Sequence, residues 1–208
     1  MKKKISSLEL SLMNFTNNVS RKKIMAFAGL VWFVYVIFHM LSLLVFHSGH
    51  EVFNQFYDWI NHLAVYHLLV LILIALLVFH VGSAISRQLR NNVSKGQSYK
   101  KPYPLAIPRI VAWGGVGALL LFIVFHFVQM KFFVTDDMYQ YMLTIFSQPL
   151  MLSVYLLGLV TLSAHLHHGL ANVLQSLGVS AVNHYRLAFV ITLLIFIGFV
   201  SVPMSILL

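Results

Sequence analysis

Five apolar runs, each as long as a helix that crosses a membrane, occupy most of this sequence. A bilayer-spanning helix takes about 20 predominantly apolar residues. The runs cover residues 24–46, 62–86, 105–130, 149–177 and 187–208. With 60% hydrophobic and 9% charged residues among 208, little of the chain remains for a soluble domain. We therefore predict an all-α membrane protein, a bundle of five transmembrane helices that forms a single domain over residues 1–208.

Basic residues gather at the ends of these runs and predict the orientation of the helices. Residues 1–23 contain two basic clusters, and five more basic residues fall between Arg87 and Lys101. Cytoplasmic segments carry an excess of Lys and Arg, so we expect the N-terminus inside and the C-terminus outside. The clusters account for the net charge of +9, so we expect no nucleic acid partner. Segment 47–61 has two acids and no Lys or Arg, and we predict an outer-face loop there.

The absence of cysteine limits the chemistry of this chain. Disulfides, thiolate-bound metals and protein-ligated iron–sulfur clusters are excluded within it, so a redox centre must be held by His or Met. No phosphate-binding glycine loop, serine triad or His-Glu-x-x-His motif occurs, and the five acids are scattered. The sequence shows no inverted repeat with broken helices, the feature that would indicate a transporter. Electron transfer is the chemistry that the remaining residues supply well.

Histidines inside the first and third predicted helices lie at similar depths. An ionisable residue within a spanning helix is a candidate functional residue. At 1.5 Å per residue, His39 lies about 24 Å beyond Lys23, and His126 lies about 25 Å beyond Arg109. Both therefore fall in the outer half of the membrane. A b-type haem takes two imidazoles from different helices of a bundle, so we predict His39 and His126 as iron ligands of an outer haem.

The second and fourth predicted helices supply another pair nearer the cytoplasm. His80 lies about 10 Å before Arg87, and His165 lies roughly 20 Å before Gly178, where a helix C-cap is expected. We predict that His80 and His165 ligate the iron of an inner haem. One histidine on each of four successive helices, in two depth classes, thus predicts two haems b.

Other residues are weaker candidates or alternatives at these sites. His67 also falls in the outer half and competes with the outer pair, and His168 shares a helix with His165 and is an alternative inner ligand. The candidates for contacts with the inner haem's pocket or propionates are His168, Arg87, Arg90 and Arg109. Those for the outer haem's propionates are Lys131 and His47.

Short motifs along nearly the whole chain carry a resemblance to a known family. They stand at 22–29 (Lys-Lys-Ile-Met-Ala-Phe-Ala-Gly), 38–40 (Phe-His-Met), 49–54 (Gly-His-Glu-Val-Phe-Asn), 78–80 (Val-Phe-His) with Gly82, 108–110 (Pro-Arg-Ile), 125–126 (Phe-His), and His165 with Gly169 and Leu170. In this order and spacing they resemble the cytochrome b subunit of succinate:quinone oxidoreductases, in the five-helix, dihaem, single-anchor class. Leu43 departs from a position that is often Asn in that class.

The resemblance implies the same two histidine pairs that depth predicts, and partners that are absent from this chain. These are a flavoprotein with FAD and an iron–sulfur subunit, docked on the cytoplasmic face. The expected function is that of a haem anchor without the dicarboxylate site. It would pass electrons between the iron–sulfur subunit of a succinate dehydrogenase or fumarate reductase and a membrane quinone, menaquinone, in the bacterial cytoplasmic membrane. Glu51 is the candidate quinone-site residue.

Two alternatives remain open at the level of sequence. The first is the haem b anchor of another membrane oxidoreductase, of the hydrogenase or formate dehydrogenase type. The second is a haem-free transporter or assembly factor whose histidines pack in the bundle. A dithionite-reduced absorption spectrum distinguishes a haem protein from the haem-free alternative. The identity of the partner that co-purifies distinguishes the expected complex from another membrane oxidoreductase.

Overall fold

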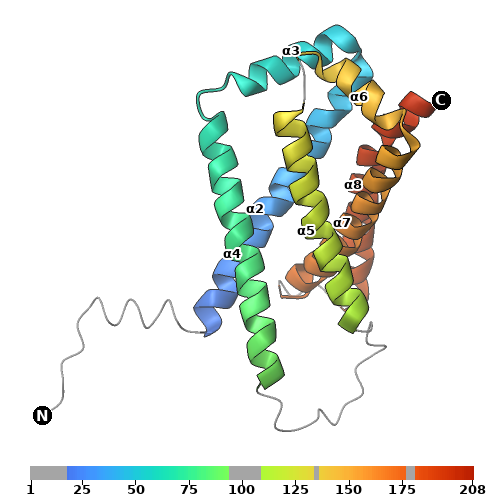
Figure 1. Cartoon of the computed structure of the whole chain (residues 1–208). Coiled ribbons are helices and arrows are strands. Elements are labelled where there is room, and N and C mark those ends of the chain that lie inside the picture. The colour runs from blue at the N-terminus through green and yellow to red at the C-terminus, as the bar shows by residue number, and fades with distance from the viewer. Residues whose placement is uncertain (1–17, 94–108, 134–135, 177–180) are drawn as a thin grey trace, which may run out of the picture. The chain divides into compact units, whose positions relative to one another are not determined.

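The computed structural model describes residues 18–93, 109–133, 136–176 and 181–208, and these ranges are helical almost throughout, with no strand (Figure 1). Side chains of some residues at helix ends, Arg87, Arg90 and Arg109 among them, lie outside this description. The elements are α2 (Asn18–Leu44), the 3-10 helix η1 (Val45–Ser48), α3 (His50–Asn61), α4 (Tyr66–Val93), α5 (Arg109–Phe132), α6 (Met138–Phe146), α7 (Pro149–Ser176) and α8 (Ala181–Leu207).

Five of the described helices are long and apolar enough to cross a membrane, so the predicted all-helical protein with five spans is confirmed to that extent. The spans are Ile24–Ser48, Tyr66–Ser86, Gly114–Phe132, Pro149–Leu174 and Asn183–Leu207. The inside and outside placement of the termini stays a prediction. Residues 1–17, the connection 94–108 and Gly178 lie outside the described residues.

The predicted outer-face loop over residues 47–61 contains helix α3, which was not predicted, and the placement of this segment outside the membrane stays a prediction. Gly49 separates η1 from α3 with φ of 94° and ψ of 174°, a conformation that is essentially restricted to glycine. Beyond it, Phe53 is fully buried and Tyr57 is half-buried one turn later. This spacing of one turn is that of an amphipathic helix with one face on the core.

A second short helix, α6, connects the third and fourth spans and was not predicted either. Its N-cap is Asp137, whose side chain accepts a hydrogen bond from the backbone N of Gln140 at 2.9 Å. Met142, Ile145 and Phe146 are buried on one face of α6. Helix α7 then begins at Pro149, where the missing N–H costs nothing because the first turn of a helix has no internal acceptor for it.

Contacts between helices divide the chain into two units, and the predicted single domain stays a prediction. The first unit comprises Met1–Tyr35 and His67–Lys101, and the second comprises Val36–Tyr66 and Pro102–Leu208. In the first unit, Trp32 Nε1 donates to the Leu73 carbonyl at 3.2 Å, and His80 Nδ1 lies 3.2 Å from the Met25 carbonyl. Residue numbers rise along α2 as they fall along α4, so these two segments are antiparallel.

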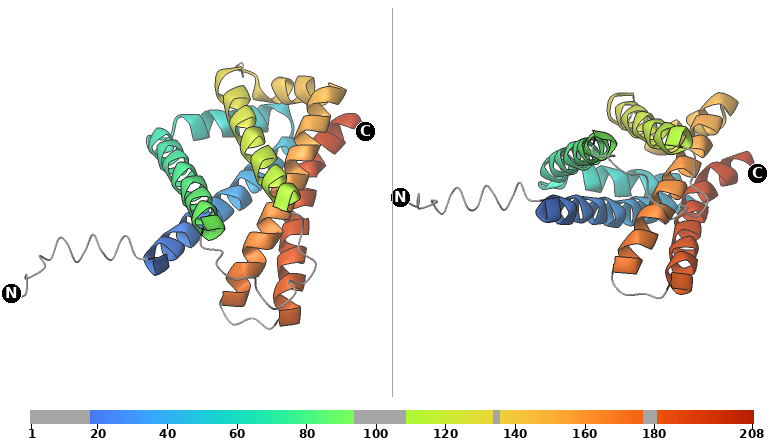
Figure 2. Two further views of the ribbon diagram at one scale, coloured as in Figure 1. Left: turned by 60° about the horizontal axis from the view of Figure 1, so that its bottom comes forward. Right: turned by 90° about the horizontal axis from the view of Figure 1, so that it is seen from below.

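The second unit is built around α7 and α8, which run side by side in both views of Figure 2. Helix α5 packs against α7, and α3 and α6 pack against each other at one end of this unit. The buried cluster at this end draws on five elements and comprises Phe46, Phe53, Met142, Ile145, Phe146, Tyr155 and Val202. Two short amphipathic helices therefore cover the end of the unit where η1 follows α2.

Candidate haem-binding site

His39 and His126 face each other within the second unit. His39 lies on α2 and His126 on α5, and their ring centroids are 5.8 Å apart with 52° between the ring planes. Both side chains are half-buried. The structure thus brings together the two residues that sequence depth predicted as the outer pair.

Aromatic side chains border both imidazoles. The Phe199 ring on α8 lies 5.7 Å from the His39 ring at 54°. The Phe122 ring, one turn before His126 on α5, is nearly parallel to the His126 ring at 5.9 Å and 19°. These apolar rings limit the access of water to the two imidazoles, as the walls of a cofactor pocket do.

A hydrogen-bonded chain leads away from His126 on the side of α7. His126 Nδ1 lies 3.2 Å from the hydroxyl oxygen of Tyr155, and that hydroxyl donates to Gln129 Oε1 at 2.8 Å. Tyr155 is 6% exposed, so water does not substitute for these partners. Burial raises the pKa of the Tyr141 phenol on α6, and Gln129 offsets part of that rise.

Close contacts of glycines set the spacing of the helices around the pair. A Cβ at Gly158 on α7 would overlap the Phe122 ring, and a Cβ at Gly198 on α8 would overlap the Met40 side chain. Phe122 and Met40 are each near a histidine of the pair in sequence. Glycine at these two positions therefore lets α7 and α8 approach the helices that carry His126 and His39.

The imidazoles of His39 and His126 are a donor set that would suit a haem. Metal–imidazole bonds are about 2 Å long, so two imidazoles on one iron have their binding nitrogens about 4 Å apart. The ring centroids of His39 and His126 are 5.8 Å apart, a separation compatible with two imidazoles on one metal ion. Among the described residues, no group of three or more His, Cys, Asp or Glu is arranged to hold a metal ion. A haem requires only two such ligands from the protein, because the porphyrin supplies the other four.

The members of the predicted inner pair lie in different units, so their pairing stays a prediction. His80 in the first unit is half-buried, and a Cβ at Gly29 would lie 3.2 Å from its Cε1 atom. His165 in the second unit is exposed on α7. His168 is also exposed, and its Nε2 lies 3.1 Å from Asn172 Nδ2.

The other residues predicted to line a haem or quinone site make the following contacts. Glu51 is exposed on α3 and accepts from Gln55 Nε2 at 3.2 Å. His47 Nε2 lies 3.0 Å from the Ser201 hydroxyl. Lys131 Nζ lies 5.0 Å from the centroid of the Tyr66 ring, a cation–π distance. The proposed roles of Arg87 and Arg109 fall on side chains outside the described residues, and the same holds for Arg90.

Three further histidines occupy different surroundings. His67, the alternative to the outer pair, is exposed on α4 in the first unit. His167 contacts the rings of Tyr185 and Phe189 on α8 at 6.2 and 6.4 Å. His184 is 2% exposed, with the Tyr185 ring 4.2 Å away.

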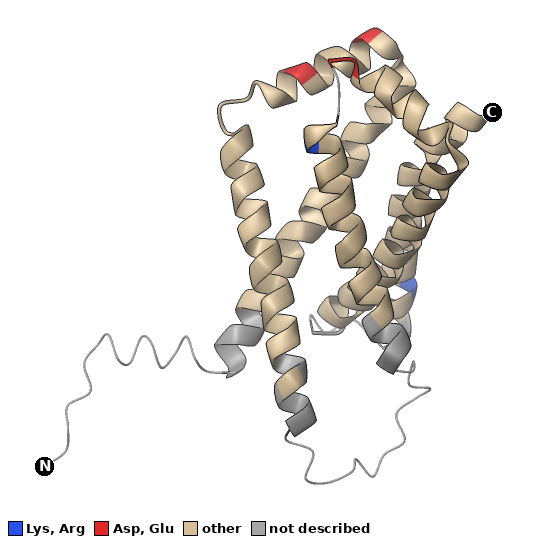
Figure 3. Ribbon diagram, viewed as in Figure 1, with Lys and Arg blue, Asp and Glu red and all other residues tan. Residues whose placement is uncertain are grey.

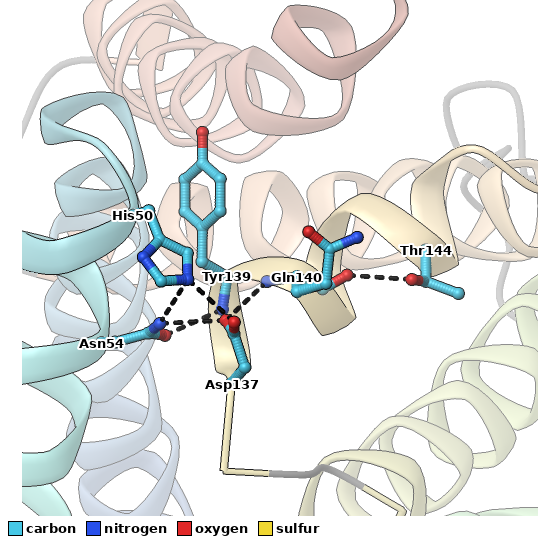
Figure 4. A network of polar contacts seen from close by, with 6 residues as sticks. All are labelled: His50, Asn54, Asp137, Tyr139, Gln140 and Thr144. Atoms are coloured by element: carbon cyan, nitrogen blue, oxygen red, sulfur yellow. Dashed lines mark hydrogen bonds and ion pairs between the residues drawn. The ribbon is translucent and has the colours of Figure 1, made fainter.

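Acidic residues mark the end of the second unit formed by α3 and α6, as Figure 3 shows. A polar network joins the two helices there (Figure 4). His50 Nε2 lies 2.8 Å from Asp137 Oδ2, and Asn54 donates to Asp137 Oδ1 at 2.9 Å while its own oxygen accepts from Tyr139 N at 2.9 Å. The hydrogen bond with His50, followed by those from the Gln140 backbone and Asn54, lowers the pKa of Asp137 to about 2.

Sequence reasoning missed Tyr155, Gln129 and the two aromatic walls. Apart from Trp113 and His126, Gln129 is the only residue of α5 with an uncharged polar side chain. A polar side chain in such an apolar helix indicates that a hydrogen-bond partner lies near it. Tyr155 stands in an apolar run of α7, and nothing in its sequence context indicates that it meets His126.

A comparison of the chain with protein-family models, curated proteins and solved structures found no match. The assignment of the site therefore depends on the geometry of its own residues.

Proposed function

We propose that this chain is the dihaem cytochrome b anchor of a succinate dehydrogenase or fumarate reductase. The observation that carries the proposal is the pair of half-buried imidazoles of His39 and His126, which face each other from two spanning helices at 5.8 Å. A pair of histidines in an apolar, aromatic-lined interior is expensive to keep without a ligand. A b-type haem is the ligand that uses two imidazoles in this arrangement.

Each residue of the outer site has a distinct task under this proposal. Haem iron, when bound, alternates between two oxidation states and so carries one electron at a time. His39 and His126 would hold the haem iron through their imidazole nitrogens, one from α2 and one from α5. Phe122 and Phe199 exclude water beside the two imidazoles, and a drier surrounding is one of the protein's means of tuning a redox potential.

An inner haem held by His80 and His165 is the second part of the proposal. Depth along the predicted helices supports two separate levels. His39 lies about 24 Å beyond Lys23, whereas His80 lies only about 10 Å before Arg87, near the predicted inner end of its helix. Electrons would then pass between two levels of the membrane, with Arg87, Arg109 and His168 as candidates for the inner pocket.

The proposed orientation places the basic inner face toward the partners. The flavoprotein with FAD and the iron–sulfur subunit would dock there, on the cytoplasmic side of a bacterial membrane, because Lys and Arg are retained on that side. The described carboxylates of Glu51, Asp58, Asp136 and Asp137 all belong to α3 or to the start of α6. A menaquinone site on this outer side, with Glu51 as a candidate group, completes the electron path.

The haem-to-protein ratio of the purified full-length chain tests the proposal. We expect two haems per chain, a dithionite-reduced absorption spectrum of the b type, and loss of one haem on replacement of each predicted ligand by Gln. The losses should fall into two matched pairs, His39 with His126 and His80 with His165. His168→Gln should retain both haems. A colourless wild-type chain from cells that supply porphyrin in excess refutes the proposal in favour of a haem-free membrane protein.

The identity of the complex is tested by co-purification from the native membrane. A flavin-bearing partner together with an iron–sulfur subunit, and succinate-dependent reduction of the haems, is the expected result. Haem reduction by hydrogen or formate, with a different partner, would instead assign the chain to another membrane oxidoreductase while leaving the haem site intact.

A further inference from the structure

Tyr155 and Gln129 lie behind His126, on the side opposite to a metal bound at Nε2. The two ring nitrogens of a neutral histidine have opposite roles, because one carries a proton and the other a lone pair. Only a nitrogen with a lone pair binds a metal. Whatever fixes the proton on one nitrogen of His126 therefore decides whether the other can be an iron ligand.

The directions of the hydrogen bonds in this chain follow from the contact between Tyr155 and Gln129. The Tyr155 hydroxyl donates to the side-chain oxygen of Gln129 at 2.8 Å. An amide oxygen carries no proton, so it can only accept in this contact. The single Tyr155 proton is thereby used, and toward His126 Nδ1, 3.2 Å away, the hydroxyl is an acceptor.

We infer that Tyr155 and Gln129 are positioning residues that hold His126 with its proton on Nδ1 and its Nε2 lone pair available to the haem iron. The inference rests on the proposed function for the identity of the metal group. Metal-binding histidines generally donate their second N–H to such an acceptor, which orients the ring and makes the ligand more basic.

Loss of the Tyr155 hydroxyl and loss of the Gln129 amide have different consequences. Tyr155→Phe removes the acceptor for Nδ1–H but leaves the aromatic packing on Phe122 and Phe146, at 5.5 and 5.0 Å, in place. Gln129→Leu frees the Tyr155 proton, which then donates to Nδ1 and moves the histidine proton to Nε2. The more distant substitution should therefore harm iron binding at least as much as the nearer one.

The test measures haem binding by the full-length chain in detergent for Tyr155→Phe, Gln129→Leu and a control, Tyr139→Phe. The control removes a phenol oxygen from the same end of the unit, where the Tyr139 ring stacks on Phe46 at 4.3 Å. We expect haem affinity at the outer level to fall about 10- to 100-fold in both test variants. The midpoint potential of the remaining outer haem should rise, because a less basic ligand stabilises ferric iron less. The inner haem and the control should be unchanged.

Unchanged outer-haem affinity and potential in both variants would overturn the inference, as would a clearly smaller effect of Gln129→Leu than of Tyr155→Phe. Should Tyr155→Phe lose both haems, Gln129→Leu decides the question, since it leaves every aromatic ring of the site in place. The proposed function fails separately. A wild-type chain that binds no haem through His39 and His126 refutes it before any variant is made.

Discussion

Gly158 is the position where the packing behind the outer pair is most directly tested. A Cβ there would overlap the Cγ, Cδ2 and Cε2 atoms of the Phe122 ring. That ring is held between the rings of His126 and Tyr155, with centroids 5.9 and 5.5 Å away. The overlap includes Cγ, the ring atom nearest the backbone, so either the Phe122 ring or the spacing of α5 and α7 must shift to restore ordinary contact.

Overpacking of this kind costs about 1–3 kcal/mol. We expect Gly158→Ala to lower the free energy of unfolding by that amount in a titration of the detergent-solubilised chain with SDS, followed by circular dichroism. Phe122→Leu removes the ring edge that the new methyl group meets. The double variant should then be more stable than the sum of the single effects predicts, with a coupling of about 1–2 kcal/mol.

A second glycine on the same pair of helices provides the control. A Cβ at Gly117 on α5 would meet no atom within 4 Å among the described residues, so Gly117→Ala should leave stability unchanged or raise it slightly. Strictly additive effects of Gly158→Ala and Phe122→Leu, or a Gly158→Ala variant as stable as Gly117→Ala, would refute the close approach of α5 and α7 and the placement of Phe122 on His126.

Two further predictions concern the end formed by α3 and α6. Replacement of Glu51 by Gln should slow quinone turnover in the intact complex without loss of haem, and unchanged turnover removes Glu51 from the quinone site. Hydrogen bonds, first that with His50, lower the pKa of Asp137 to about 2, so its stabilisation of the start of α6 is fully present above the ordinary carboxyl pKa of about 3.9. It should be lost only as pH falls through about 2, with faster amide exchange in α6, and Asp137→Asn should abolish this step.

The five spans and the histidines within them were predictable because each depends on a signal local to one stretch of sequence. An apolar run of spanning length needs no knowledge of its neighbours. The predicted bounds differ from the observed helices by a few residues: the second helix begins at Tyr66, where a start at residue 62 was expected. Depth along the membrane follows from helix rise alone, so His39 and His126 could be matched before the structure was known.

The short helices, and the hydrogen-bonded chain from His126 through Tyr155 to Gln129, were not predictable because they do not depend on a signal local to one stretch of sequence. α3 turns away from η1 through the conformation of one glycine, Gly49, and α6 starts at a cap, Asp137, whose side chain is shared with α3. Neither has the length of a span. Gln129 and Tyr155 belong to different helices, and their meeting depends on the approach of α5 and α7 at Gly158.

Depth fixes only one coordinate of a ligand, and the direction around the helix axis separates His165 from its alternative. On α7, Gly158 faces α5, because a Cβ at this position would overlap the Phe122 ring. His165 follows Gly158 by about two turns of 3.6 residues, so it lies on nearly the same face of α7, whereas His168 is rotated from that face by about 80°. His167 lies on the other side, against Tyr185 and Phe189 of α8. The face of α7 that meets α5 is therefore the one that carries His165, and we predict that His168→Gln keeps the haem that His165→Gln loses.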